Sequence, residues 1–175
     1  MVHKDHVALI RNGVPKDKSI WADFGSGDGA FTLALAELTD PQSEIFSIDK
    51  DQKRLLAQQE LFQEMFPELN VHFIYADFLK PLSLPSFDGI LMANSLHFIQ
   101  QKKVFLETIR TRLKDTGRLL LVEYNVDEGN MWVPYPLSFD SFKKIAEEAG
   151  FHNPELLTTV PSRFLTEMYA AVAYK

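Results

Sequence analysis

Short apolar segments recur along the chain, separated by longer segments with helical spacing. Nearly continuous apolar runs that end in a polar residue or a glycine are typical of buried strands. Apolar residues spaced three or four positions apart predict helices that bury one face. The runs that predict strands are 20–24, 45–49, 71–75, 87–93 and 119–124, and the segments that predict helices are 5–12, 30–38, 51–66, 100–114 and 138–149.

Two further apolar runs, at 156–160 and 169–174, predict two more strands near the C-terminus. The connection between them is too short for a crossover helix, so we expect the two strands to pair antiparallel. The alternation of strands and helices predicts an α/β protein with a doubly wound, mostly parallel seven-stranded sheet that ends in an antiparallel hairpin. Its 175 residues suit one domain, spanning 1–175.

A glycine-rich turn joins the first predicted strand to the next helix. Gly25, Gly27 and Gly29 stand at alternate positions, where they permit positive φ angles and let a ligand approach bare main chain. The helix expected to start near Asp28 or Gly29 points free N–H groups and the positive end of its dipole at the same place. The turn therefore predicts a cradle for an anionic part of a cofactor.

The turn alone fits two kinds of cofactor. Gly25-Ser-Gly27-Asp-Gly-Ala30, with Asp49 further along, satisfies the dinucleotide fingerprint. However, Asp23-x-Gly25-x-Gly27-x-Gly29 resembles motif I of the class I S-adenosylmethionine (SAM) methyltransferases. The same resemblance extends to residues after later strands: Ile48-Asp49, Ala76-Asp77-Phe78, Asn94-Ser95-Leu96-His97 and the segment 113–123.

This resemblance implies a Rossmann-like methyltransferase fold and methyl transfer from SAM, leaving S-adenosylhomocysteine. It implies that Asp23 and the glycines hold the methionyl part, that Asp49 binds the ribose and that Asp77 binds adenine. The full set of implied cofactor contacts is Asp23, Gly25, Ser26, Gly27, Gly29, Asp49, Lys50, Asp77, Phe78 and Asn94. The chain departs from the family at Thr116, where a glycine is common, and it has no long insertion to build a lid.

Methyl transfer depends mainly on proximity and orientation, so it requires no elaborate triad. If the acceptor is a hydroxyl, a base would help to remove its proton, and His97 is our candidate because imidazole can act as a base at neutral pH. Packing or helix capping is an equally good interpretation of His97. Glu123 and Tyr124 could also face the pocket, and the loop with Trp132 and Tyr135 could close over an apolar or aromatic acceptor.

Composition narrows the choice of chemistry. The chain has no cysteine, which excludes disulfides, thiolate metal sites and a cysteine nucleophile; we predict no metal site. A net charge of −6 argues against nucleic-acid and anionic membrane partners. No apolar run is long enough to span a bilayer and no secretory signal is evident at the N-terminus, so we expect a soluble, cytoplasmic protein.

The leading hypothesis is therefore an enzyme that methylates a small-molecule acceptor with SAM. Two alternatives stay open. One is a non-catalytic methyltransferase-like subunit, suggested by the missing lid, and with it a homodimer or a partner chain that completes the pocket. The other is an NAD(P)-dependent oxidoreductase, which the dinucleotide fingerprint permits, although the chain lacks a second domain and an evident Tyr/Lys pair.

Overall fold

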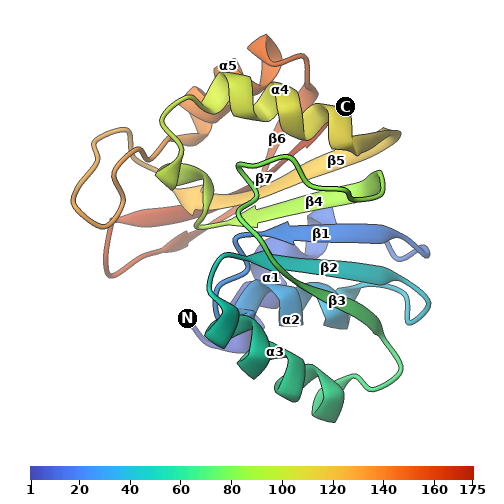
Figure 1. Ribbon diagram of the computed structural model, residues 1–175. Helices are drawn as coiled ribbons and strands as arrows, with labels where there is room; N and C mark the ends of the chain where they lie inside the picture. Colours follow the sequence, from blue (N-terminus) through green and yellow to red (C-terminus); the bar gives the residue numbers. More distant parts are fainter.

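The computed structural model describes residues 1–175 and contains one seven-stranded sheet flanked by helices (Figure 1). The strand order is β3-β2-β1-β4-β5-β7-β6, with β1 to β5 parallel and β7 antiparallel to both of its neighbours. The predicted α/β class and C-terminal hairpin are confirmed. The strands are β1 (Ile20–Phe24), β2 (Glu44–Asp49), β3 (Asn70–Tyr75), β4 (Phe87–Ala93), β5 (Leu113–Tyr124), β6 (His152–Pro161) and β7 (Glu167–Tyr174).

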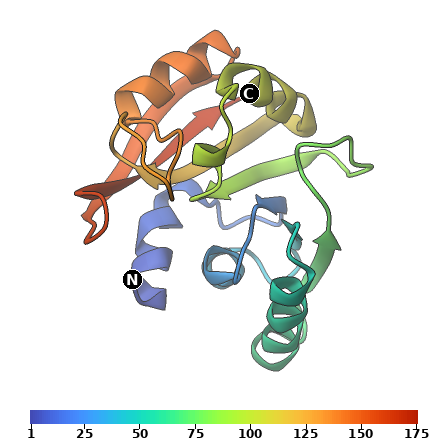
Figure 2. The ribbon, with the colours of Figure 1, turned by 60° about the vertical axis from the view of Figure 1, so that its left-hand side comes forward.

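Helices cover both faces of the sheet. In Figures 1 and 2, α1 to α3 lie on one side and α4 and α5 on the other. The helices are α1 (His3–Ile10), α2 (Ala30–Leu38), α3 (Gln52–Met65), α4 (Lys102–Arg112) and α5 (Phe139–Glu148), with short 3₁₀ turns at Arg11–Gly13 and Leu96–Phe98. Two apolar clusters fill the two layers, and the fully buried Trp21 and Phe142 belong to different clusters.

Three predicted boundaries were wrong. The first helix was expected to begin at residue 5, but it begins at His3 with Val2 as its N-cap, and Asp5 accepts a hydrogen bond from the backbone N–H of Val2. Residues 115–118 were expected to connect the helix at 100–114 to a strand at 119–124. Instead β5 begins at Leu113 and bulges, because its register shifts between the pairs Phe87–Leu113 and Gly89–Arg118.

β6 also begins before Pro154, earlier than its apolar run suggested. Its pairing with β7 shifts register between His152 and Glu155, an irregularity where a proline without an N–H is tolerated.

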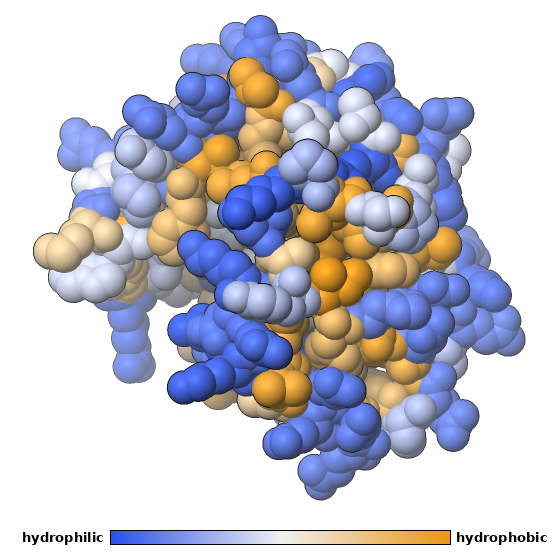
Figure 3. Space-filling model, in the orientation of Figure 1, coloured by the Kyte–Doolittle hydropathy of each residue, from blue (hydrophilic) through white to orange (hydrophobic).

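The connection between β3 and β4 carries no helix. It crosses in front of the sheet in Figure 1, and Phe78, Leu82 and Leu84 from it pack against the buried core. Figure 3 shows apolar residues gathered over the middle of this face with hydrophilic residues around them. This connection therefore covers part of the face of the sheet, and only its first residues, 77–79, line the cavity at the carboxyl ends of the strands.

No helix in the structure is long and apolar enough to cross a membrane.

Candidate cofactor and acceptor site

The glycine turn after β1 has the backbone that its sequence predicted. Gly25, Gly27 and Gly29 have φ angles of 81°, 55° and 80°, in the left-handed region that favours glycine. The N–H groups of Gly25 and Ser26 donate to the carbonyl oxygen of Ile48, so the turn is tied to the end of β2. Helix α2 covers the predicted segment, Ala30–Leu38, and Gly29 is its N-cap.

Close packing explains why Gly25 has no side chain. A Cβ atom added there would lie 2.7 Å from Cβ of Ser95, which follows β4. The Ser95 hydroxyl donates to the carbonyl oxygen of Phe24 at 2.7 Å. The first turn of the loop is thus held against the residues that follow a second strand.

Gln58 supports the glycine turn from α3, a contact that was not expected from the sequence. Its Nε2 donates to the carbonyl oxygen of Gly27 (2.6 Å) and to Oγ of Ser26 (3.1 Å), while its Oε1 accepts from Oγ of Ser47 (2.8 Å). The side chain is buried. A polar residue within the buried face formed by Leu55 and Phe62 was the available signal, because an amide at such a position needs partners.

Asp23 lies at the end of β1 with one oxygen satisfied and one not. Oδ2 accepts from the hydroxyl of Thr32 (2.6 Å), whereas Oδ1 is buried with no hydrogen-bond partner. Burial raises the pKa of Asp23 to about 7, the nearby charge of Asp49 adds to this, and the Thr32 hydrogen bond opposes it. The free oxygen is therefore suited to a cationic donor, which would stabilise the ionised carboxylate.

Asp49, at the end of β2, connects the glycine turn to α3. Its Oδ2 accepts from the N–H of Gly27 and its Oδ1 accepts from the N–H of Asp51, both at 2.8 Å. Asp51 is the N-cap of α3 and accepts from the N–H groups of Lys53 and Arg54. Asp51 and not Asp49 therefore caps α3, and the Asp49 carboxylate belongs to the lining of the cavity described below.

Asp77 and Phe78 follow β3 and also line the cavity described below. Oδ1 of Asp77 accepts from the N–H of Leu79 (3.0 Å), and the ring of Phe78 stacks on Phe24 with 5.7 Å between centroids. Asn94, after β4, has a φ of 52° and a buried Oδ1 without a partner. Polar groups from four neighbouring strand ends therefore converge.

A cavity of about 610 Å³ lies between these strand ends. It brings together nine of the ten predicted cofactor residues: Asp23, Gly25, Ser26, Gly27, Asp49, Lys50, Asp77, Phe78 and Asn94. Gly29 does not line it and instead shapes the turn. Ser95, from the segment 94–97, also lines the cavity, as do His6, Arg54 and Phe98, which were not expected from the sequence. No group of three or more His, Cys, Asp or Glu side chains is arranged to hold a metal ion.

His97 does not line this cavity, although Ser95 and Phe98 on either side of it do. It is buried, and its Nδ1 lies 2.7 Å from Oε2 of Glu123, while its backbone N–H donates to Oε1 of the same carboxylate (3.0 Å). The structure thus joins two of the candidates from sequence, His97 and Glu123, into one buried pair beside the cavity.

Comparison with protein families matches residues 16–158 to a family described as "Methyltransferase domain". Among related sequences is the "Ubiquinone/menaquinone biosynthesis C-methyltransferase UbiE" of Wigglesworthia glossinidia brevipalpis, 24% identical over 172 residues, covering 97% of this chain and 64% of the relative. The protein of the same description from Azotobacter vinelandii is 26% identical over 147 residues, covering 74% of this chain and 58% of the relative. The chain spans about three fifths of these relatives.

Solved structures share the fold. The YcgJ protein of Bacillus subtilis has a TM-score of 0.79 at 14% identity, covering 99% of both chains. The 1,6-didemethyltoxoflavin-N1-methyltransferase of Burkholderia thailandensis, solved with 1,6-didemethyltoxoflavin and S-adenosylhomocysteine bound, has a TM-score of 0.78 at 18% identity, covering 99% of this chain and 77% of that one.

Proposed function

Because the chain belongs to the methyltransferase domain family, we propose that residues 1–175 act as one SAM-binding domain that transfers a methyl group to a small-molecule acceptor. The observation that carries the proposal is the single cavity where a glycine turn meets carboxylates from the ends of β1, β2 and β3. Such convergence at the carboxyl ends of parallel strands is where open α/β sheets bind ligands.

The residues present fit SAM. The unpartnered Oδ1 of Asp23 suits the cationic amino group of the methionyl part, and the close contact at Gly25 leaves main chain bare beside it. Asp49 supplies a carboxylate for the ribose hydroxyls. Asp77 and Phe78 supply an acceptor and a ring for adenine.

When bound, SAM supplies a methyl carbon attached to a positively charged sulfur. The chain's own part is to bind, orient and shield, which contributes most of the rate in such displacements. Asp49 holds the glycine turn as well as offering an oxygen to the ligand, so binding and loop geometry depend on the same carboxylate.

Several features support a small-molecule acceptor. The related C-methyltransferases from Wigglesworthia and Azotobacter take part, by their names, in ubiquinone and menaquinone biosynthesis, and the Burkholderia enzyme acts on 1,6-didemethyltoxoflavin. The net charge of −6 disfavours nucleic-acid and anionic membrane partners.

The proposal includes a cytoplasmic location, in keeping with a chain without cysteine.

The test is calorimetric titration of the purified protein with S-adenosylhomocysteine and, separately, with NADH. Binding of S-adenosylhomocysteine alone supports the proposal and directs a screen of small acceptors with labelled SAM. Binding of NADH alone overturns it in favour of an oxidoreductase. Binding of neither favours a non-catalytic subunit or a pocket that a homodimer or partner chain completes.

A further inference from the structure

Glu123 and His97 form a buried pair in which the carboxylate fixes the imidazole at two points. The side chains are 0% and 4% exposed. Oε1 accepts from the backbone N–H of His97, and Oε2 lies 2.7 Å from Nδ1. An ionised carboxylate can only accept, so Nδ1 carries a proton. In the neutral ring, Nε2 is then the atom with a free electron pair.

The other ring nitrogen is left free by the fold. Nε2 of His97 makes no hydrogen bond to the protein. It also differs from the unpaired side-chain atoms that are fully buried, such as Oδ1 of Asp23, because it is not fully buried. A buried imidazole with one nitrogen held by a carboxylate and the other open is the arrangement in which histidine accepts a proton from a bound ligand.

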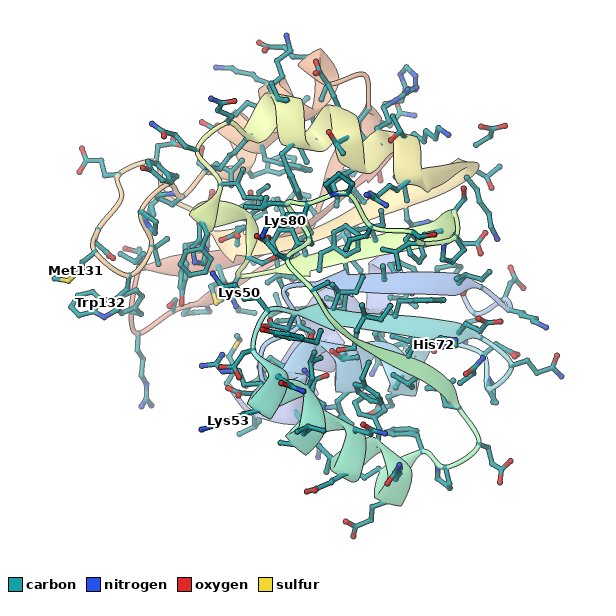
Figure 4. The ribbon with its side chains drawn as sticks, viewed as in Figure 1. Lys50, Lys53, His72, Lys80, Met131 and Trp132 are labelled. Atoms are coloured by element: carbon teal, nitrogen blue, oxygen red, sulfur yellow. The ribbon has the colours of Figure 1, made fainter.

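Aromatic side chains from separate segments lie in a series that starts beside the His97 ring. The ring of Phe98 lies 4.3 Å from that of His97 and the ring of Tyr124 lies 6.2 Å from it. Phe164, from the connection between β6 and β7, lies 5.7 Å from Tyr124 and 6.1 Å from Trp132. Phe98, Trp132 and Phe164 are 61%, 66% and 49% exposed, and Figure 4 shows Trp132 at the outer edge of the loop after β5.

From this geometry we infer that the acceptor is an aromatic compound with an ionisable hydroxyl group, stacked among Phe98, Tyr124, Phe164 and Trp132, and that Nε2 of His97 takes the hydroxyl proton. Glu123 is the positioning residue that fixes the tautomer. The inference rests on the proposed function and deepens it.

The step balances with the groups present. The acceptor O–H bond breaks, the proton moves to Nε2, and the electron pair stays on the acceptor. That pair forms the bond to the methyl carbon of SAM as the bond from this carbon to sulfur breaks toward sulfur. Glu123 balances the charge of the imidazolium that results.

Three titratable groups on neighbouring elements interact with the charge of Glu123. Lys102 of α4 and Tyr169 of β7 both feel the charge of Glu123, as does Tyr124 on its own strand. Burial, with Glu123 as the second cause, raises the pKa of Tyr124, and burial lowers the pKa of Lys102 while Glu123 opposes that change. Tyr124 therefore favours its protonated form more strongly than an exposed tyrosine does.

The first test is nitrogen-15 NMR of the histidine rings in the protein bound to S-adenosylhomocysteine, with 4-nitrophenol as the probe. We expect His97 to carry its proton on Nδ1, and we expect 4-nitrophenol to shift its Nε2 resonance and to bind with a larger phenolate fraction than free probe at the same pH. A proton on Nε2, or binding that leaves Nε2 unchanged, overturns the inference.

Two substitutions separate the roles of the pair. His97→Asn keeps a donor near the Nδ1 position but removes Nε2, so 4-nitrophenol affinity should fall about tenfold or more, the factor for one charge-assisted hydrogen bond. In Glu123→Gln, the amide oxygen can accept from the backbone N–H and the amide nitrogen can donate to Nδ1. We expect that variant to move the His97 proton to Nε2 and, because Nε2 can then no longer accept a proton, to bind 4-nitrophenol without the larger phenolate fraction, which a merely structural role of Glu123 would leave unchanged.

A matched control is the more exposed His–Glu pair of His72 with Glu44, in which the two side chains lie 3.3 Å apart and are each about two fifths exposed. Figure 4 shows His72 at the far end of the sheet from Trp132. His72→Asn should leave 4-nitrophenol affinity unchanged. Trp132→Ala and Phe164→Ala should each weaken it several-fold, whereas Val104→Ala, an exposed apolar residue on α4, should not.

Failure of this inference is distinguishable from failure of the proposed function. If S-adenosylhomocysteine binds but 4-nitrophenol does not, or binds equally to His97→Asn, the inference is wrong and the methyltransferase proposal stands. If S-adenosylhomocysteine does not bind, the proposed function fails and this inference falls with it.

Discussion

The backbone N–H of Gly27 donates a 2.8 Å hydrogen bond to Oδ2 of Asp49. These two residues are separated by a helix and a strand in the sequence, yet the bond connects the glycine turn directly to the end of β2. A carboxylate that was expected only as a ribose ligand therefore also shapes the loop that it serves.

Asp49→Ala should weaken S-adenosylhomocysteine binding by tenfold to about a hundredfold, which corresponds to the loss of one hydrogen bond to a charged group at roughly 1.5 to 3 kcal/mol. Calorimetric titration measures the change. Asp115→Ala is the control, since Asp115 is fully exposed at the start of β5. Equal affinity in Asp49→Ala and the wild type would remove Asp49 from the site.

Gly25→Ala should lower both stability and cofactor affinity. The left-handed backbone alone costs an alanine about 1 to 2 kcal/mol, and the new Cβ would meet Ser95 at 2.7 Å. Gly150→Ala provides the comparison: Gly150 also has a positive φ, of 88°, but it contacts Arg110 and not the cavity. We expect urea unfolding to show destabilisation in both variants and titration to show weaker binding only in Gly25→Ala.

Asp23 should make stability depend on pH. Its pKa rises from 3.8 in the unfolded chain to about 7 in the fold, so the fold favours the protonated form. As pH increases through this range, the unfolded chain ionises first and the folded state loses on the order of 4 kcal/mol relative to it. In Asp23→Asn this dependence should disappear, which urea unfolding at about pH 5 and about pH 8 would test. The same slope in both proteins would contradict the assignment.

The same carboxyl should link cofactor binding to protons. An ammonium group beside Oδ1 favours the ionised form, so S-adenosylhomocysteine affinity should fall as pH drops below about 7, and binding near that pH should release a proton. Calorimetry in buffers of different ionisation enthalpy measures the proton release. Asp23→Asn should bind weakly at every pH and release none.

Gln58→Leu tests the support of the glycine turn from α3. The substitution keeps the approximate size but leaves the hydroxyls of Ser26 and Ser47 and the carbonyl of Gly27 with fewer partners, at a cost of about 1 to 3 kcal/mol. We expect lower stability and several-fold weaker S-adenosylhomocysteine binding. Gln59→Leu, at the exposed neighbouring position, should change neither; unaltered binding in Gln58→Leu would show that the turn holds its shape without this amide.

The elements that were predictable from sequence are those whose signal is local. The strands at 20–24 and 87–93 matched their apolar runs, and the positive φ angles of the turn followed from glycine at alternate positions. The bulge at the start of β5 was not predictable, because it arises from pairing with Phe87 and Gly89, far away in the sequence. A bulge and a turn both place a glycine after polar residues, so Gly117 could not distinguish them.

Strand-end acids were predictable for a topological reason, since parallel strands bring their carboxyl ends to one edge. The partners of those residues were not. Nothing within the segment 94–97 indicated that His97 would be enclosed by Glu123 while its neighbours faced the cavity. Likewise, Gln58 was recognisable only as a polar residue in an apolar helix face, with its partners fixed by tertiary packing.

The cofactor cavity takes its lining from residues no later than Ile99, whereas Tyr124, Trp132 and Phe164 all come after it in the chain. Apart from His97 and Phe98, the proposed acceptor residues thus lie in the later half of the sequence, and the donor site lies in the earlier half. Mutations in the later loops can accumulate, or whole loops can be exchanged between relatives, without disturbing the methyl donor's half. Such a chain can acquire new acceptors during evolution while it inherits its donor site intact.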